Sequence, residues 1–299
     1  MTLMKNGVTQ QKDLLTTRGS KRNTTRLSRL WSIIRARPGL SIGVFLLLLM
    51  LLMSVLVGVL RPYTATEVSG IPFLAPNAEH WLGTDELGRD YFVRVCVAAR
   101  TSLSISVVAA LLSMLVGSTI GLAAGLRGGF LDSVLMGAVD LLVSLPSIVV
   151  ALGAVAVFSP STTTLIIVLS IVSVPHFARV IRARCMELRE REFVMSARVS
   201  GVSTVRIAIR HLIPNVLTVT MVQLSNTAAI VILMESGLSY LGLGVQPPTP
   251  SWGKMIAESQ SYMVESPWLP LVPFIALLIT SSAWGLIGEG FAAKKHAAV

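Results

Sequence analysis

The sequence predicts an all-α integral membrane protein with six transmembrane helices. Apolar residues make up 53% of the 299 residues and charged residues only 13%, about half of the ~25% that is typical of soluble domains. The mean hydropathy is +0.73. Six stretches contain enough apolar residues to cross a bilayer, which takes ~20. This composition excludes a single soluble domain.

The six predicted spans are separated by segments of very different length. The first, 39–60, has an apolar run of about 22 residues, longer than the ~7–15 of a secretory signal peptide, so we interpret it as a retained anchor. Pro175 and His176 near the end of the fourth span make it the weakest by pattern. The spans after the first are expected at about 97–125, 133–158, 162–181, 213–241 and 268–290.

Basic residues gather on one side of these spans. The first 38 residues hold nine Lys or Arg, and residues 179–210 hold eight Arg. With Arg127 and two lysines near the C-terminus, twenty of the 25 basic residues fall on this side. The positive-inside rule therefore places both termini and the arginine-rich loop in the cytoplasm. The net charge of +10 marks this face, next to anionic lipid, and nucleic-acid binding is disfavoured because the basic tail has no aromatic platform except Trp31.

The spans divide the chain into parts with different roles. The segment before the second span is long for a connection and needs its own structure or a partner. Between the fifth and sixth spans, the prolines of QPPTP (246–250) predict a rigid turn and not a helix. The parts are a cytoplasmic basic tail, 1–38; the first transmembrane helix, 39–60; an external segment, 61–96; a five-helix core, 97–290, with a cytoplasmic loop at 182–212; and a cytoplasmic tail, 291–299.

A stripe of small residues runs along the second span. Gly117, Gly121 and Gly125 recur at every fourth position, which lets another helix approach closely. The approaching helix belongs either to the same bundle or to a second subunit, and we favour the same bundle.

The motifs of common catalytic sites are missing from the sequence. No GxxxxGK[ST] phosphate loop, HExxH zinc site or GxSxG nucleophile elbow is present. Two cysteines and four histidines give no metal-ligand pattern. We therefore expect no catalytic residues, no metal and no cofactor in this chain.

Two acidic residues lie within the predicted spans, Asp140 and Glu235. A carboxylate inside a membrane is costly and is a candidate functional group. These two residues either line a substrate pathway or pack against neighbouring helices, and we favour packing. They are weak support for a proton-coupled carrier, which typically has more coupling groups and paired broken helices.

The loop before the fifth span reads EFVMSARVSGVSTVRIAIRHLIPN (192–215) and predicts two short helices. Gly201 ends the first, because glycine takes the left-handed conformation at little cost. Ser203 caps the second, and Pro214 breaks the chain before the span. The first helix fits a groove on a cytoplasmic partner or lies on the lipid surface. Its candidate docking residues are Glu192, Phe193, Ser196, Ala197, Arg198 and Gly201.

This loop resembles the EAA loop of ABC-importer permeases, which reads EAA, three residues, Gly, nine residues, then I-x-L-P. Ala197, Gly201 and Pro214 stand at matching positions, and Ile213 replaces the Leu conservatively. The chain departs from the pattern at three positions, with Met195, Ser196 and His211 in place of the Glu, the first Ala and the Ile. In that family the loop forms a coupling helix that docks in a cleft of the ATP-binding subunit.

A second resemblance is to the dipeptide/oligopeptide/nickel permeases of the DppC/OppC type. It rests on LGTDELGRD (82–90), followed in family order by GGFLD, VDLLVSLPS, ESGLSYLGLG and QPPTPSWG. The first motif suits a helix start, capped by Thr84 or Asp85, with Asp85 and Arg89 paired four residues apart. It either anchors the external segment or contacts a delivery protein or second permease. Its candidate residues are Gly83, Thr84, Asp85, Gly88, Arg89 and Asp90.

The resemblance implies the type I ABC importer permease fold in a bacterial inner membrane. It also implies a heterodimer with a second permease, two cytoplasmic ATP-binding subunits that hold ATP and Mg, and an extracytoplasmic substrate-binding protein. Peptides are the expected cargo, with glutathione, nickel chelates and oligosaccharides as alternatives. The chain would be a pathway and a lever, not an enzyme.

Two other classes of protein remain open at this point. An ion-gradient-driven secondary transporter would work without ATPases. A membrane scaffold or sensor would bind a cytoplasmic partner and transport nothing.

Overall fold

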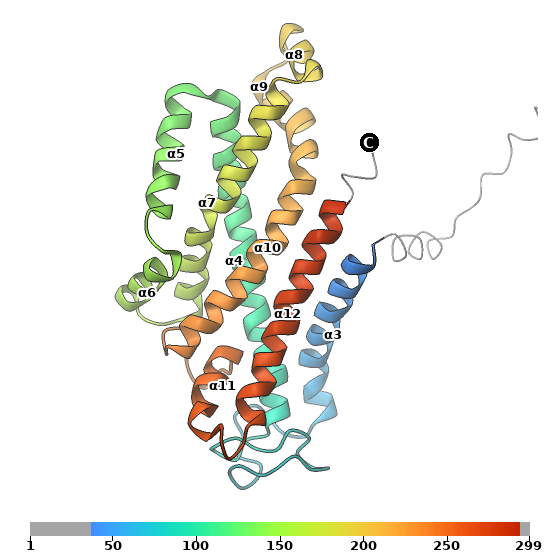
Figure 1. Ribbon diagram of the computed structural model, residues 1–299, viewed down its shortest axis with the longest axis vertical. Coiled ribbons are helices and arrows are strands. Elements are labelled where there is room, and N and C mark those ends of the chain that lie inside the picture. Colours follow the sequence, from blue (N-terminus) through green and yellow to red (C-terminus); the bar gives the residue numbers. More distant parts are fainter. Residues whose placement is uncertain (1–36, 294–299) are drawn as a thin grey trace, which may run out of the picture. The chain divides into compact units, whose positions relative to one another are not determined.

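The computed structural model describes residues 37–293, and within this range every regular element longer than an isolated bridge is a helix (Figure 1). The predicted all-α class is confirmed. The predictions for residues 1–36 and 294–299 lie outside the described part of the chain. The helices are α3 (Pro38–Leu60), α4 (Tyr91–Arg127), α5 (Gly129–Val143), α6 (Ser147–Phe158), α7 (Thr162–Arg189), α8 (Glu192–Val199), α9 (Thr204–Ile207), α10 (Ile213–Tyr240), α11 (Trp252–Ser259) and α12 (Trp268–Ala292), with a π-helical turn at Ala208–Leu212 and a 3-10 turn at Gln260–Tyr262.

The third predicted span is not one straight helix. Five helical segments of the described residues are long and apolar enough to cross a membrane, and a sixth crossing exists only if α5 and α6 count as one broken span. These two helices are bent by 84°. Pro146 explains the bend, because it has no N–H to continue α5 and holds the residue before it, Leu145, out of the helical region. The residues on both sides of this break are similarly apolar, so hydropathy alone does not reveal it.

Three other predicted boundaries differ from the structure. The second span starts at Tyr91 instead of 97, so the external segment is shorter than expected. The fourth span does not end at 181, since α7 continues through Pro175 to Arg189, and the predicted loop at 182–212 begins in a helix. Neighbouring helices support a membrane helix across a proline.

Pro214 does not break the chain before the fifth span either. Residues Thr204–Tyr240 form one membrane-length helix in which the π-helical turn comes directly before Ile213. Pro214 has no N–H to donate, and a widened turn absorbs the missing α-helical bond.

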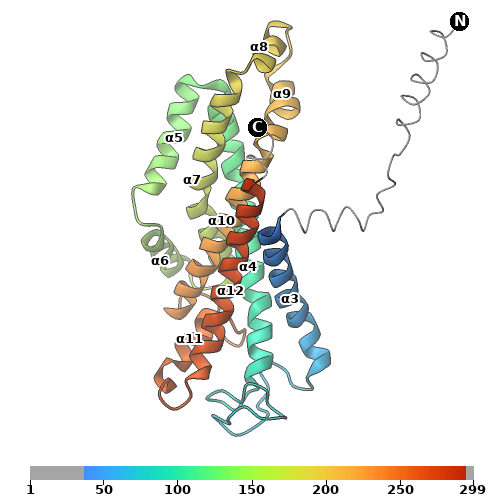
Figure 2. The same ribbon diagram turned by 45° about the vertical axis from the view of Figure 1, so that its right-hand side comes forward.

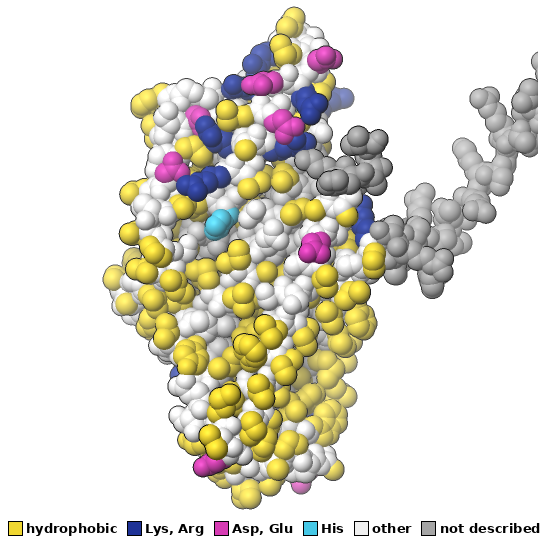
Figure 3. Space-filling view, viewed as in Figure 1, with side chains coloured by type: hydrophobic (Ala, Val, Ile, Leu, Met, Phe, Trp, Pro, Cys, Tyr) yellow, Lys and Arg dark blue, Asp and Glu magenta, His cyan; other side chains and the backbone are white. Residues whose placement is uncertain are grey.

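The helical unit that begins at Gly39 has two chemically different ends (Figures 1 and 2). We call the end with α8 and α9 the arginine-rich end, and the end with residues 61–90 the loop end. In Figure 3, Lys and Arg side chains gather at the arginine-rich end, above a surface that is mainly hydrophobic.

The glycine stripe of α4 packs against α7, inside the same bundle. A Cβ atom on Gly117 would lie 2.6 Å from the Cβ of Phe177, and one on Gly121 would lie 2.5 Å from the carbonyl oxygen of Ala178. A Cβ atom on Gly125 would lie 2.6 Å from the Cβ of Cys185. The favoured interpretation of the stripe is therefore confirmed.

Similar close contacts hold the two terminal spans together. Gly43 of α3 faces the backbone of Ala283 in α12, and Gly290 of α12 faces Leu40 of α3. Near the loop end, α11 inserts Trp252 and Met255 into a cluster shared by α4, α10 and α12. The prolines of QPPTP lie outside any helix, as predicted, and α11 begins directly after them.

Candidate functional site

Asp85 lies at the centre of the loop end. Its side chain is buried, with 1% of the residue exposed. One carboxylate oxygen accepts the backbone N–H groups of Leu87 and Arg89, both at 2.9 Å. The other oxygen lies 2.6 Å from Arg89 Nε and 3.1 Å from Arg94 Nε. The predicted pair of Asp85 and Arg89 is present, although these residues form a turn and not a helix.

Asp90 is the residue that starts α4. One oxygen of its fully buried carboxylate accepts the N–H of Val93 at 3.0 Å and caps the helix. The other oxygen lies 2.8 Å from His80 Nδ1 and 3.2 Å from Arg61 Nη2. The expectation that Thr84 or Asp85 caps this helix is wrong, because both side chains are used within the preceding turns.

Thr84 and two glycines shape those turns. The hydroxyl of Thr84 donates to the carbonyl of Ile71 at 2.6 Å and accepts the N–H of Leu74 at 2.9 Å. Gly83 and Gly88 have φ angles of +73° and +75°. A side chain at either position would collide with a backbone carbonyl, so only glycine fits. The LGTDELGRD motif thus builds the turns that hold the loop end.

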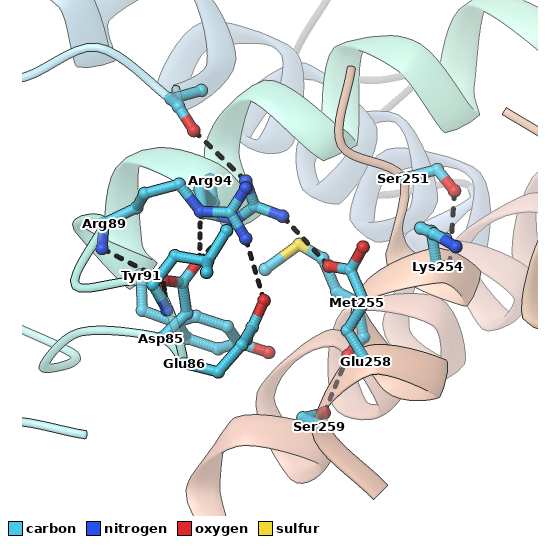
Figure 4. Close-up of polar contacts among 12 residues, drawn as sticks. Asp85, Glu86, Arg89, Tyr91, Arg94, Ser251, Lys254, Met255, Glu258 and Ser259 are labelled. Atoms are coloured by element: carbon cyan, nitrogen blue, oxygen red, sulfur yellow. Dashed lines mark hydrogen bonds and ion pairs between the residues drawn. The ribbon is translucent and has the colours of Figure 1, made fainter. Parts of the chain in front are cut away.

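Arg94 connects this motif to α11 (Figure 4). It is 3% exposed, and besides Asp85 it binds Glu258 of α11 at 3.1 Å and the carbonyl of Ala65 at 3.2 Å. Glu86 joins the network by accepting from Arg89 at 2.9 Å. Burial, and then the charge of Asp85, raise the pKa of the Glu86 carboxyl.

Sequence reasoning did not find Arg94, Glu258 or His80. Arg94 and Glu258 are 164 positions apart in the chain, so no local pattern connects them. The available signal is an arginine three residues before the predicted span at 97–125, because a cation that the helix carries toward the membrane requires a partner.

At the arginine-rich end, α8 is fixed to the bundle by one apolar residue. Val194 is completely buried. Val194 was not among the predicted docking residues. Those residues are exposed, except Ala197, which is partly buried against the same cluster and so is only partly available to a partner. The cluster around Val194 comprises Ile181, Cys185, Leu188, Ile207, Leu212 and Val216, from α7 and from the helix through α9 and α10.

Gly201 ends α8 in the way that the sequence predicts. Its φ angle is +75°. The N–H of Gly201 donates to the carbonyl of Arg198 at 3.0 Å, and the N–H of Val202 donates to that of Ala197 at 3.1 Å. These two bonds form a Schellman motif. On the outer face of α8, the exposed fractions of Phe193, Met195 and Val199 are 43%, 56% and 90%.

Two ion pairs join α5 to α7 below this loop. Arg182 binds Asp132 with two nitrogens, at 2.5 and 2.6 Å. Arg179 lies 2.6 Å from Asp140, and both of these side chains are about half exposed. Asp140 is therefore paired with a neighbouring helix and still faces the surface.

Glu235 lies in a different place and in a different environment. It is fully buried in α10 and accepts hydrogen bonds from Ser239 at 2.7 Å and Ser236 at 3.3 Å. The structure does not bring Asp140 and Glu235 together. Among the described residues, no group of three or more His, Cys, Asp or Glu side chains is arranged to hold a metal ion.

The described residues thus form several membrane-length helices, with a short exposed helix at one end and a loop braced by ion pairs at the other. Residues 117–293 match the family described as binding-protein-dependent transport system inner membrane component. The chain belongs to this family. It is a multi-pass membrane protein and the permease subunit of an ABC transporter, in which partner ATPases hydrolyse ATP. Such importers also use a second permease and a substrate-binding protein.

Curated relatives are similar over most of their length. The dipeptide transport system permease protein DppC of Alkalihalophilus pseudofirmus is 38% identical over 215 residues, covering 72% of this chain and 71% of the relative. DppC of Bacillus subtilis is 34% identical and covers 87% and 82%. The glutathione transport system permease protein GsiD of Pectobacterium atrosepticum is 34% identical and covers 86% of each.

A solved structure has the same fold. A chain in inward-facing crystals of the MetNI methionine ABC transporter matches with a TM-score of 0.55 at 15% identity, over 66% of this chain and 93% of that one. The type I importer permease fold is confirmed.

Proposed function

We propose that this chain is one of two permease subunits in an ATP-driven importer of dipeptides and oligopeptides. The similarity to two dipeptide permeases, over most of each chain, carries the proposal. Glutathione is the second candidate cargo, because a glutathione permease is 34% identical. Both cargoes are small peptides, which fits one class of pathway.

The proposed orientation places the arginine-rich end in the cytoplasm of a bacterial inner membrane. The gathering of Lys and Arg at that end supports it. The arginines of the loop end that lie at the α11 junction, Arg89 and Arg94, are paired with acids there. The loop end then faces the extracytoplasmic binding protein, and α8 faces two ATPases that hold ATP and Mg. This chain itself holds neither.

In this proposal α8 is the coupling helix. Val194 joins it to α7 and to the helix that continues into α10. Since α7 packs on the glycine stripe of α4, and α10 packs on α12, a displacement of α8 moves a contiguous set of spans. Closure of the ATPases on ATP would act on the exposed face of α8 and switch the pathway between its inward-open and outward-open states.

Cross-linking in the reconstituted transporter tests the docking of α8. Ser196→Cys on the exposed face should cross-link to an ATPase subunit, with a yield that changes when ATP is added. Thr119→Cys, exposed on α4, is the matched control and should give no such product. The two natural cysteines are buried and give little background. Equal yields at both positions would refute the docking role.

Uptake into proteoliposomes tests cargo and energy source. Labelled dipeptide should accumulate with ATP and without an ion gradient, and unlabelled glutathione should compete only if both use this pathway. Uptake that follows an ion gradient in the absence of ATP would contradict the importer assignment.

A further inference from the structure

Arg100 lies alone on the surface of a membrane-spanning helix. It is nine residues into α4, or roughly 14 Å from the start of that helix. Its side chain is exposed. The other loop-end arginines, Arg61, Arg89 and Arg94, each pair with a carboxylate. No partner for Arg100 is found among residues 37–293.

The side chain of Arg100 lines a groove between α3 and α4, and this groove has a volume of about 460 Å³. The walls are almost entirely apolar and include Leu47, Leu48 and Leu51 of α3. Trp284 of α12 lines the same groove, and its indole Nε1 is buried without an acceptor in the described part of the chain. Within the described residues, the groove is therefore lined by one exposed arginine without a partner and by one tryptophan whose buried N–H has no acceptor.

The surroundings of the groove are those of a lipid-facing surface. α3 is the least buried of the membrane-length helices, with 17% of its apolar window buried. Large apolar residues are exposed along its whole length, from Ile42 and Phe45 to Val59. The 23 residues of this helix contain no charged side chain. Hydrocarbon chains are the natural neighbours of such a helix.

The direction of the groove fits a lipid molecule. Val57 of α3 packs against Val93 and Cys96 of α4, so the two helices run antiparallel and Arg100 lies one turn deeper than this contact. A long arginine side chain can extend from that depth toward the headgroups of the loop-end leaflet. The leucines continue from there toward the middle of the membrane.

We propose that the α3–α4 groove binds an anionic phospholipid of the loop-end leaflet. The guanidinium of Arg100 binds the phosphate, for which its fork of N–H donors is well suited. One acyl chain lies along Leu51, Leu48 and Leu47 toward Trp284. An uncompensated cation in an apolar groove favours a lipid with net negative charge over a zwitterionic one. The site depends on neither the cargo nor the direction of transport.

Native mass spectrometry of the full chain, purified with its partner subunits, tests this site. Phosphatidylglycerol and phosphatidylcholine with identical acyl chains are titrated separately. We expect the first phosphatidylglycerol to bind at least tenfold more tightly than phosphatidylcholine. Arg100→Gln should remove this preference, whereas Arg206→Gln, an exposed arginine at the arginine-rich end, should keep it.

A groove-filling variant separates the lipid from a protein partner. Leu51→Trp keeps Arg100 and should lower the retention of both lipids, because the acyl chain loses its place. If Arg100→Gln prevents assembly with the partner subunits, the lipid retention of Leu51→Trp tests the proposal instead. Unchanged phosphatidylglycerol retention in Leu51→Trp would overturn the proposal. So would unchanged lipid binding in Arg100→Gln together with loss of the second permease, which would assign Arg100 to a carboxylate of that subunit.

Discussion

Two buried carboxylates, Asp85 and Asp90, hold the loop end by pairing with cations from separate segments. Asp90 joins Arg61, which follows α3, to His80 and to the start of α4. Asp85 joins the turn before α4 to Arg94 within it. The Asp85 carboxylate also accepts two backbone N–H groups and the Asp90 carboxylate accepts one, so the hydrogen-bonding capacity of both is largely used. Buried charges satisfied in this way fix geometry, and removing one leaves the others unpaired.

Asp90→Ala should strongly lower the free energy of unfolding. It removes a helix cap and leaves Arg61 buried without its carboxylate, which typically costs about 3–5 kcal/mol. We expect a lower Tm in detergent and faster proteolysis within residues 61–90. Glu79→Ala is the control, because Glu79 is exposed and only accepts from Tyr63. Equal Tm values for the two variants would contradict the role of Asp90.

Glu86 gives the loop end a predictable pH dependence. Its pKa is raised in the folded protein, so the folded state binds this proton more tightly than the unfolded state. The associated stability is present below the ordinary glutamate pKa and is lost as pH rises through the raised value. Glu86→Gln keeps the acceptor for Arg89 without the charge. Its Tm should therefore exceed that of the natural protein at neutral pH, and the difference should shrink as the pH falls. A difference that grows toward acid pH would have the wrong sign.

At the scale of elements, the contact between α4 and α7 has no space for a side chain. Gly121→Ala would place Cβ 2.5 Å from the carbonyl oxygen of Ala178 and 3.0 Å from Ile181 Cβ. Overpacking of this kind costs about 1–3 kcal/mol. Gly137→Ala on α5 is the matched control, since nothing lies within 4 Å of its Cβ position. Thermal unfolding in detergent should lower the Tm of the first variant only.

Gly201 allows a graded test of the loop that it ends. Asparagine tolerates the left-handed conformation, whereas valine and proline do not. Gly201→Asn should keep ATP-driven uptake near the natural level. Gly201→Val and Gly201→Pro should lose most uptake while the protein still inserts in the membrane at normal levels. Full uptake in Gly201→Pro would show that the Schellman motif is not needed for coupling.

At the scale of the whole molecule, the uneven distribution of arginine sets the proposed orientation. Val264, 97% exposed at the loop end, and Val199, 90% exposed on α8, report on opposite sides. In spheroplasts, a membrane-impermeant maleimide should label Val264→Cys directly and Val199→Cys only after permeabilisation. The reverse pattern would invert the topology.

The predictions that succeeded and failed can be separated by what hydropathy reports. Length and hydropathy located the spans because a bilayer imposes about 20 apolar residues on any helix that crosses it. They could not find the 84° bend between α5 and α6, since the residues on both sides of Pro146 are equally apolar. The sequence placed Asp85 and Arg89 four apart, but only the fold shows that they close a turn.

Sequence alone determined the all-α class, the concentration of Lys and Arg on one side of the spans, the left-handed glycine after α8 and the family motifs. These are local properties, set by composition and by contacts within a few residues. Tertiary structure decided the partners of Arg94 and Asp90, the burial of Ala197 and the isolation of Arg100. Each of these depends on which distant segments meet, and sequence spacing does not specify such meetings. The physical reason is that the burial of these side chains and their ion pairs depends on contacts between segments that are far apart in the sequence.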